Sequence, residues 1–203
     1  MKKEWNHNIH YHEYLLKQKP AHFSSALEIG SGAGLFSSRL AAEFDSVISM
    51  EPDVEALDHA RALYKDLENI TYLKEGFLDY DFGNRKFDYI CAIASVHHMD
   101  YGKALEKMKE LLNPGGKVVI LGLYRESSLI DLLTSLAAII PNLIRNRPLK
   151  HNASSYEFVT ATPPLSIGEM MEENRRILKS FKFRRHLYWR YSLIYTERNN
   201  SPK

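Results

Sequence analysis

Three glycines on alternate residues, Gly30, Gly32 and Gly34, follow a short apolar stretch that begins at Ala26. Glycine has no Cβ and adopts positive φ readily, so a turn of this composition lets the backbone pass close to a ligand. A helix expected to begin near residue 35 would direct its free N–H groups toward the same turn. We therefore expect a polar ligand to lie across residues 30–34.

Polar side chains follow the next expected strands. Glu51 lies 21 residues after Gly30, where a carboxylate can accept hydrogen bonds from both hydroxyls of a ribose. Asp79 follows a later strand and could accept a hydrogen bond from an exocyclic amine, while Phe77 or Leu78 packs on a base. Because ligands bind beyond the carboxyl ends of the strands in an open parallel sheet, this joint spacing predicts a nucleoside-containing ligand.

The elements that position these residues alternate between strand and helix. Apolar runs predict strands at residues 26–29, 46–50, 70–74, 87–94 and 117–123, with helices at 35–44, 53–67 and 101–112 between them. A helix at 166–178 and two closely spaced strands at 182–187 and 191–197 complete the chain, and the short join between these strands favours an antiparallel hairpin. The fold class is therefore α/β: a mostly parallel seven-stranded sheet with helices on both faces and a C-terminal antiparallel β-hairpin.

Length and composition predict one domain over residues 1–203. Within it we expect an N-terminal cap segment at 1–20 and a lid-like helical insertion at 125–180. The insertion contains an apolar helix at 128–144 that is too short and too interrupted for a membrane span, so membrane contact is not expected. A homodimer contact through this helix is an alternative to a lid.

Charge and cysteine content limit the class of partner. A formal net charge of +2 is too small to favour nucleic-acid binding, and one cysteine, Cys91, excludes an internal disulfide. The polar, histidine-rich N-terminus has no signal-peptide core, so we expect a cytoplasmic protein. His7, His10 and His12 do not complete a recognised ligand set, and no metal is expected.

The glycine spacing decides between nucleoside ligands. A dinucleotide fingerprint requires G-x-G-x-x-G, whereas this chain has G-x-G-x-G followed by Leu35 and Phe36. With its closing hairpin, the chain resembles a class I S-adenosylmethionine-dependent methyltransferase of the type 11/12 group, which has a Rossmann-like fold. The resemblance is close over residues 26–123 and looser in the hairpin. Its motifs are Leu27-Glu28-Ile29-Gly30-Ser31-Gly32-Ala33-Gly34, Glu51-Pro52-Asp53, Asp79, Ser95-Val96-His97-His98, Asn113-Pro114-Gly115-Gly116 and Trp189-Arg190-Tyr191-Ser192-Leu193.

The resemblance implies a set of cofactor-binding residues for S-adenosylmethionine and its product S-adenosylhomocysteine. Gly30, Gly32 and Gly34 would line the methionine and ribose portion, with Glu28 near the ammonium group. Glu51 would hold the ribose hydroxyls and Asp79 the adenine amine. The remaining expected contacts are Pro52, Leu78, Ala94 and Ser95, the last two beside the transferring methyl group.

Methyl transfer from a sulfonium is an in-line displacement, so alignment and deprotonation of the acceptor are the main tasks of the protein. His97, His10 and Tyr11 are the candidate bases or orienting groups. The Asp/Asn-Pro-Pro-aromatic signature of amino-methyltransferases is absent after the fourth strand, and we expect a small-molecule acceptor. A non-catalytic S-adenosylmethionine-binding module and, less favoured, a NAD(P)-dependent oxidoreductase are the alternatives.

Overall fold

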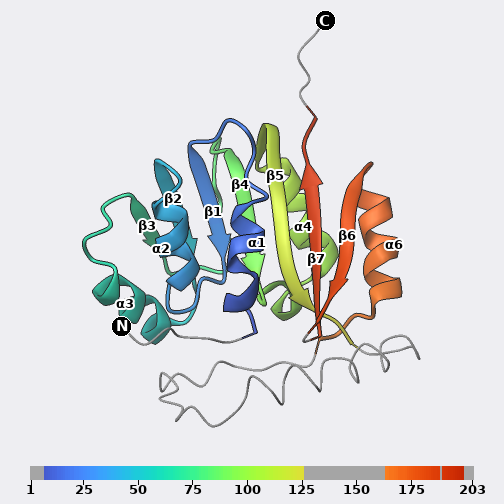
Figure 1. The fold of residues 1–203 in the computed structure, drawn as a ribbon, viewed down its shortest axis with the longest axis horizontal. Coiled ribbons are helices and arrows are strands. Elements are labelled where there is room, and N and C mark those ends of the chain that lie inside the picture. The colour runs from blue at the N-terminus through green and yellow to red at the C-terminus, as the bar shows by residue number, and fades with distance from the viewer. Residues whose placement is uncertain (1–6, 126–162, 188, 199–203) are drawn as a thin grey trace, which may run out of the picture.

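The computed structural model describes residues 7–125, 163–187 and 189–198. Its centre is a seven-stranded sheet in the order β3-β2-β1-β4-β5-β7-β6 (Figure 1). The strands are β1 (Ser25–Ile29), β2 (Ser46–Met50), β3 (Ile70–Leu73), β4 (Phe87–Ile93), β5 (Leu112–Leu123), β6 (Phe181–His186) and β7 (Arg190–Thr196). The helices of the described part are η1 (Ile9–Tyr11), α1 (His12–Leu16), α2 (Leu35–Ala41), α3 (Val54–Leu63), η2 (Val96–His98), α4 (Tyr101–Glu110) and α6 (Ile167–Ile177).

Strand pairing confirms the predicted sheet. β1 pairs in parallel with β2 on one side and with β4 on the other, and the parallel part extends to β3 and β5. β7 inserts antiparallel between β5 and β6, which forms the closing hairpin. The strand order therefore reverses between β1 and β4, where ligands bind in open α/β sheets.

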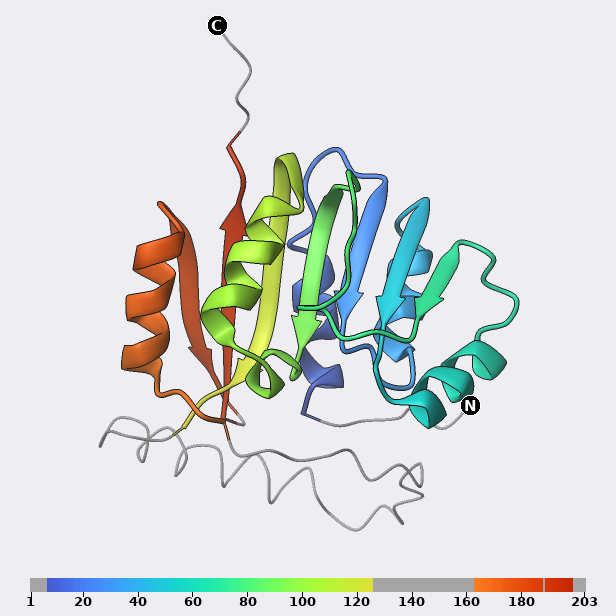
Figure 2. The ribbon, with the colours of Figure 1, turned by 180° about the vertical axis from the view of Figure 1, so that it is seen from behind.

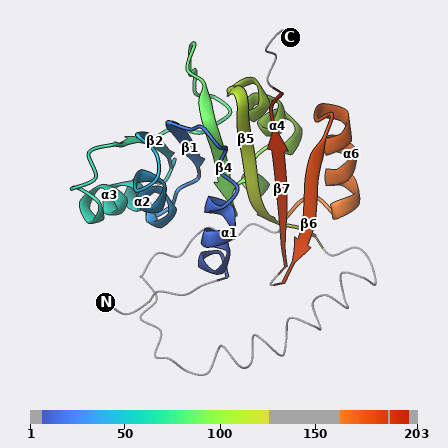
Figure 3. The same ribbon diagram turned by 45° about the horizontal axis from the view of Figure 1, so that its top comes forward.

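Two apolar clusters form the core, one on each face of the sheet. α1 and α2 cover one face (Figures 1 and 3), and α4 and α6 cover the other (Figure 2). Alternation along β1 sends Leu27 and Ile29 toward α4 and Ala26 toward α2. Cys91 is a free, fully buried thiol in the α2-side cluster, as expected for a small buried hydrophobe.

Between β3 and β4, residues 74–86 contain no helix, and buried Phe77 and Phe82 cover the sheet there. One boundary of the expected elements was wrong. The expected break at 113–116 lies inside β5, because Leu112 already pairs with Phe87 before the register shifts. The irregular backbone at these glycines is therefore a bulge within the strand and not a separate loop.

The described part of the expected insertion 125–180 contains α6. Ser166 caps this helix in a reciprocal capping box with Glu169, as their spacing predicts. α6 packs beside α4 on the sheet face, and the Tyr101 hydroxyl of α4 donates to Asn174 Oδ1 of α6 at 2.8 Å. The apolar stretch 128–144, with the homodimer contact expected of it, lies outside the described residues. Among those described, no helix is long and apolar enough to cross a membrane.

The described part of the N-terminal cap segment packs on the α2 side of the sheet. The Tyr89 hydroxyl of β4 donates to the Leu15 carbonyl at 2.9 Å, and Leu15 is fully buried. His12 lies edge-on to Phe36 of α2, with ring centroids 4.8 Å apart. The segment is thus joined both to the sheet and to the helix that follows the glycine turn.

Candidate active site

The glycine turn closes the end of β1 against β2. The N–H groups of Gly30 and Ser31 both donate to the Met50 carbonyl, at 2.8 and 2.9 Å. Gly30, Gly32 and Gly34 have φ values of +71°, +52° and +77°, so all three occupy the left-handed region that favours glycine. The structure thus confirms that this turn uses the conformational freedom predicted from its composition.

Close packing also explains why glycine is needed at the two ends of the turn. A Cβ on Gly34, the N-cap of α2, would lie 2.8 Å from the Cβ of Ala60 on α3. A Cβ on Gly30 would lie 2.4 Å from the Cβ of Ser95, at the end of β4. The turn therefore sits against both α3 and the end of β4.

Glu51 follows β2 and faces the turn. Its Oε2 accepts from the Gly32 N–H at 2.8 Å and its Oε1 accepts from the Asp53 N–H at 3.0 Å. These bonds fix the carboxylate beside the turn, and each oxygen retains capacity for a further donor such as a ribose hydroxyl. Asp53 is the N-cap of α3, so Pro52, expected in the first turn of that helix, instead precedes the cap and is exposed.

Asp79 lies exposed in the loop after β3, and Leu78 beside it is half-buried. Lys107 of α4 holds this loop: its Nζ donates to the carbonyls of Leu78 and Tyr80 at 2.8 and 2.7 Å. The same ammonium lies 5.3 Å from the centroid of the Phe77 ring. Lys107 thus fixes the backbone of the loop that carries Asp79, the expected adenine contact.

We predict that Lys107→Met weakens S-adenosylhomocysteine binding about tenfold, because two backbone carbonyls lose their shared donor and the loop loses order. Lys103→Met, one turn earlier on α4 with an exposed side chain, is the matched control. Calorimetric titration of both variants measures the effect. Equal affinities of the two variants would show that the loop is held without Lys107.

The end of β4 approaches the turn through Ala94 and Ser95. Ala94 has a φ of +51°, unusual for a residue with a Cβ, and Ser95 is buried. The Ser95 hydroxyl donates to the Ile29 carbonyl at 2.6 Å, which ties the ends of β4 and β1 together. Both residues therefore lie at the strand-order reversal, as the sequence predicts.

His97 lies in η2, directly after this strand end. Its ring contacts the ring of exposed His98, with the centroids 4.1 Å apart and the planes tilted by 37°. Burial, followed by the charges of His98 and Arg190, lowers the pKa of His97 to about 4. The imidazole is therefore neutral at neutral pH, and its buried Nδ1 has no hydrogen-bond partner among the described residues.

Glu28 is buried beneath the turn and is not on its surface. The Ser37 hydroxyl of α2 hydrogen-bonds to Glu28 and also lies 2.9 Å from the Ser49 hydroxyl of β2. Burial raises the pKa of Glu28 to about 8, so this carboxyl is largely protonated at neutral pH. Glu28 therefore helps to hold α2 through Ser37. This geometry does not support the contact with an ammonium group that the resemblance implies.

The other two candidate bases lie in the N-terminal segment. Tyr11 is buried, and its hydroxyl donates to the Leu187 carbonyl at 3.0 Å, just before β7. His10 is exposed and lies edge-on to Tyr11, with centroids 4.7 Å apart. The Tyr11 hydroxyl is therefore engaged in packing between the cap segment and the hairpin, and His97 alone of the three follows β4 directly.

The sequence did not predict the roles of two residues near the site. Lys107 was not singled out, because a lysine on an amphipathic helix is usually a solvated residue. Gly122 also escaped notice, although the Tyr191 ring would lie 2.5 Å from its Cβ. Three-dimensional contact, and not local pattern, defines the role of each.

The residues of the turn suit S-adenosylmethionine. The Ser31 hydroxyl oxygen is buried within the turn and has no hydrogen-bond partner among the described residues. A buried polar atom of this kind is satisfied when a ligand supplies a polar group. The turn contains no lysine or arginine, consistent with a ligand that carries no phosphate.

Comparison with known proteins agrees with this geometry. Residues 26–116 match the family model of a methyltransferase domain. The matched residues include the glycine turn, Glu51 and the end of β4, so this part of the chain is similar to a methyltransferase domain. An uncharacterized methyltransferase of Mycobacterium tuberculosis is 27% identical over 194 residues, covering 94% of this chain and 95% of the relative.

Solved structures show the same fold. YcgJ of Bacillus subtilis superposes with a TM-score of 0.65 at 16% identity, over 87% of this chain and 71% of YcgJ. The N-methyltransferase NodS of Bradyrhizobium japonicum, in complex with S-adenosylhomocysteine, has a TM-score of 0.61 at 16% identity, over 95% and 87% of the two chains. The chain therefore shares its fold with NodS, which binds S-adenosylhomocysteine.

Proposed function

We propose that this protein is an S-adenosylmethionine-dependent methyltransferase that transfers the methyl group of its cofactor to a small-molecule acceptor by in-line displacement. The observation that carries the proposal is the meeting of the glycine turn, the Glu51 carboxylate and the end of β4 at the strand-order reversal. The cofactor supplies an activated methyl group on a sulfonium. The protein's own contribution is to orient the two reactants.

We assign the cofactor-binding roles as follows. The backbone of the turn receives the methionine and ribose portion, and Glu51 accepts from the ribose hydroxyls. Asp79 and Leu78 receive the adenine, on the loop that Lys107 holds. Ala94 and Ser95 lie beside the methyl group, with His97 on the acceptor side.

We predict that Glu51→Gln weakens S-adenosylhomocysteine binding by about tenfold to a hundredfold, because hydrogen bonds to a charged acceptor are replaced by neutral ones. Glu55→Gln, an exposed change in the first turn of α3, is the matched control. Isothermal titration calorimetry measures both. Unchanged affinity in Glu51→Gln would remove Glu51 from the ribose site.

Turnover tests the proposed function directly. A library of small acceptors is incubated with S-adenosylmethionine and the protein, and release of S-adenosylhomocysteine is measured. We expect release that depends on one acceptor class and falls in Glu51→Gln. Tight S-adenosylhomocysteine binding with no release in any acceptor class would favour the non-catalytic binding module, and NADH binding in its place would favour the oxidoreductase alternative.

A further inference from the structure

A cavity of about 700 Å³ begins at the end of β4 and lies between α4 and α6. Much of its described lining is apolar, including Val96, Met99, Leu123, Leu165 and Met170. The rings of Tyr101 and Tyr191 add aromatic surface. A cavity of this size and composition suits a small molecule with an apolar body.

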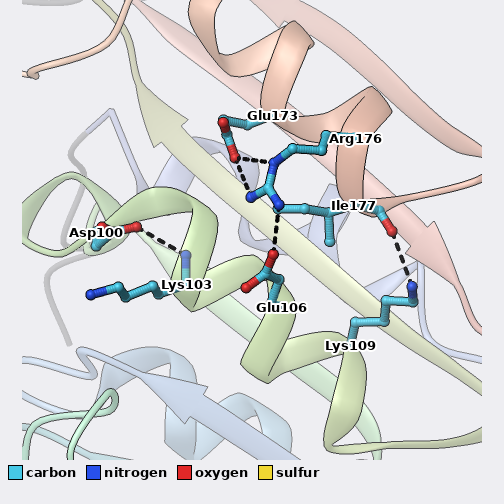
Figure 4. A network of polar contacts seen from close by, with 7 residues as sticks. All are labelled: Asp100, Lys103, Glu106, Lys109, Glu173, Arg176 and Ile177. Carbon is cyan, nitrogen blue, oxygen red and sulfur yellow. Dashed lines mark hydrogen bonds and ion pairs between the residues drawn. The ribbon is translucent and has the colours of Figure 1, made fainter.

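The carboxylates that line the cavity already have partners within the two helices. Glu106 and Glu173 accept from Arg176 at 2.8 and 2.7 Å, and Asp100 accepts from the Lys103 N–H at 2.9 Å (Figure 4). A cationic amine entering the cavity would have to displace one of these bonds. The lining therefore does not favour an ammonium acceptor.

His97 lines the same cavity beside Val96. Its ring is neutral at neutral pH and its buried Nδ1 has no partner among the described residues. So weak a base removes a proton from an ordinary alcohol poorly, because proton transfer needs matched pKa values. An acceptor whose oxygen is already ionised requires no such transfer.

The positive charge of Arg190 acts on His97 from the other face of the sheet. Arg190 begins β7 opposite Leu123, a residue of the cavity lining, and its Nε donates to Asn8 Oδ1 at 2.9 Å. Arg190 is half-buried, and its charge contributes, after burial and the charge of His98, to the lowered pKa of His97. Burial disfavours any unpaired charge at this place, but the positive charge of Arg190 favours an anion over a cation there.

We propose that the acceptor is an apolar acid whose ionised oxygen, a carboxylate or a phenolate, lies beside His97 in this cavity; this rests on the methyl transfer proposed above. The oxygen lone pair forms the new C–O bond while the C–S bond to the methyl group breaks and its electron pair stays on sulfur. The products are a methyl ester or an aryl methyl ether, together with S-adenosylhomocysteine. No proton needs to move in this step.

Binding of matched probes to the S-adenosylhomocysteine-saturated protein tests the proposal. Benzoate, 4-nitrophenol, benzyl alcohol and benzylamine share one ring size and differ in charge. We expect benzoate or 4-nitrophenolate to bind at least about tenfold more tightly than benzyl alcohol and benzylamine. Turnover with benzoate or with 4-nitrophenol then distinguishes the carboxylate from the phenolate.

Variants locate the probe and identify the charge that holds it. Leu165→Trp fills the cavity from its half-buried edge and should abolish anion binding, while S-adenosylhomocysteine affinity stays within about twofold. Bound 4-nitrophenol should show the absorption band of its phenolate at a pH below the pKa of free 4-nitrophenol. Arg190→Met should remove this band, and Arg190→Lys should retain it. A structural role of Arg190 alone would not separate these two variants.

Two results would overturn the inference: tighter binding of benzylamine than of both anions, or anion binding that survives Leu165→Trp. Both are read in protein already shown to bind S-adenosylhomocysteine. Failure of the wild-type protein to bind S-adenosylhomocysteine would instead contradict the proposed function. The two failures are therefore distinguishable.

Discussion

Gly30→Ala is expected to lower the free energy of unfolding by about 3 kcal/mol or more. A left-handed φ of +71° costs a residue with a Cβ about 1 kcal/mol, and overpacking against Ser95 costs about 1–3 kcal/mol more. Ser95 has little room to move, because it is buried and its hydroxyl is bonded to the Ile29 carbonyl. In a domain of this size the loss corresponds to a melting temperature lower by about 10 °C.

Gly83→Ala is the matched control for this prediction. Gly83 also has a positive φ, +57°, but no atom lies within 4 Å of the place its Cβ would take. It should lose about 1 kcal/mol from backbone strain alone. Adding Ser95→Gly to Gly30→Ala should recover part of the loss, because it removes the opposing Cβ. Equal melting temperatures for Gly30→Ala and Gly83→Ala would show that β1 and β4 do not meet closely at this point.

Local pattern predicted the sheet well because each strand carries its own signal. The apolar runs at β1, β4 and β5 are buried on both faces, and strand-length apolar runs are readable without knowledge of their partners. The capping box at Ser166 and the positive-φ turn at Gly30 are likewise local patterns. The alternation of strands and helices predicted the parallel sheet, whereas the strand order came from the structure.

Contacts between distant residues could not be predicted in this way. Lys107 reaches the loop after β3 across 29 residues of sequence, and the charge of Arg190 acts on a histidine in a different element. Phe77 was expected, as one of two candidates, to pack on a base, but it is buried with Phe82 against the sheet between β3 and β4. The acid at Glu28 was assigned to the ligand, whereas its alternation along β1 directs it under α2.

Glu28→Gln is expected to remove a pH-dependent loss of stability between about pH 5.5 and pH 7.5, whereas the opposite contribution of His12, His97 and His186, whose pKa values are lowered to about 4, should remain. The pKa of Glu28 is raised to about 8 in the folded protein, above the ordinary value of 4.5. The folded state therefore holds at Glu28 a proton that the unfolded chain releases in this range, and the contribution of Glu28 to the free energy of unfolding falls as pH rises. The stabilisation is fully present below the unfolded pKa and is lost as pH rises through the folded pKa.

The slope of this loss is about 1.4 kcal/mol per pH unit, so the wild-type protein should lose about 3 kcal/mol over the stated range from this group alone. Glutamine keeps the size and the hydrogen-bonding oxygen of the protonated acid but has no proton to lose. Urea unfolding at several pH values compares the variant with Glu110→Gln, which removes an exposed carboxylate at the end of α4 and should keep the wild-type slope. If Glu28→Gln also kept that slope, the Glu28 carboxyl would have to be charged in the folded state, and the hydroxyls of Ser37 and Ser49 would then be donors to an anion beneath the turn. Removal of the loss would instead place a neutral acid there, so that Glu51 provides the anionic oxygens beside the cofactor turn.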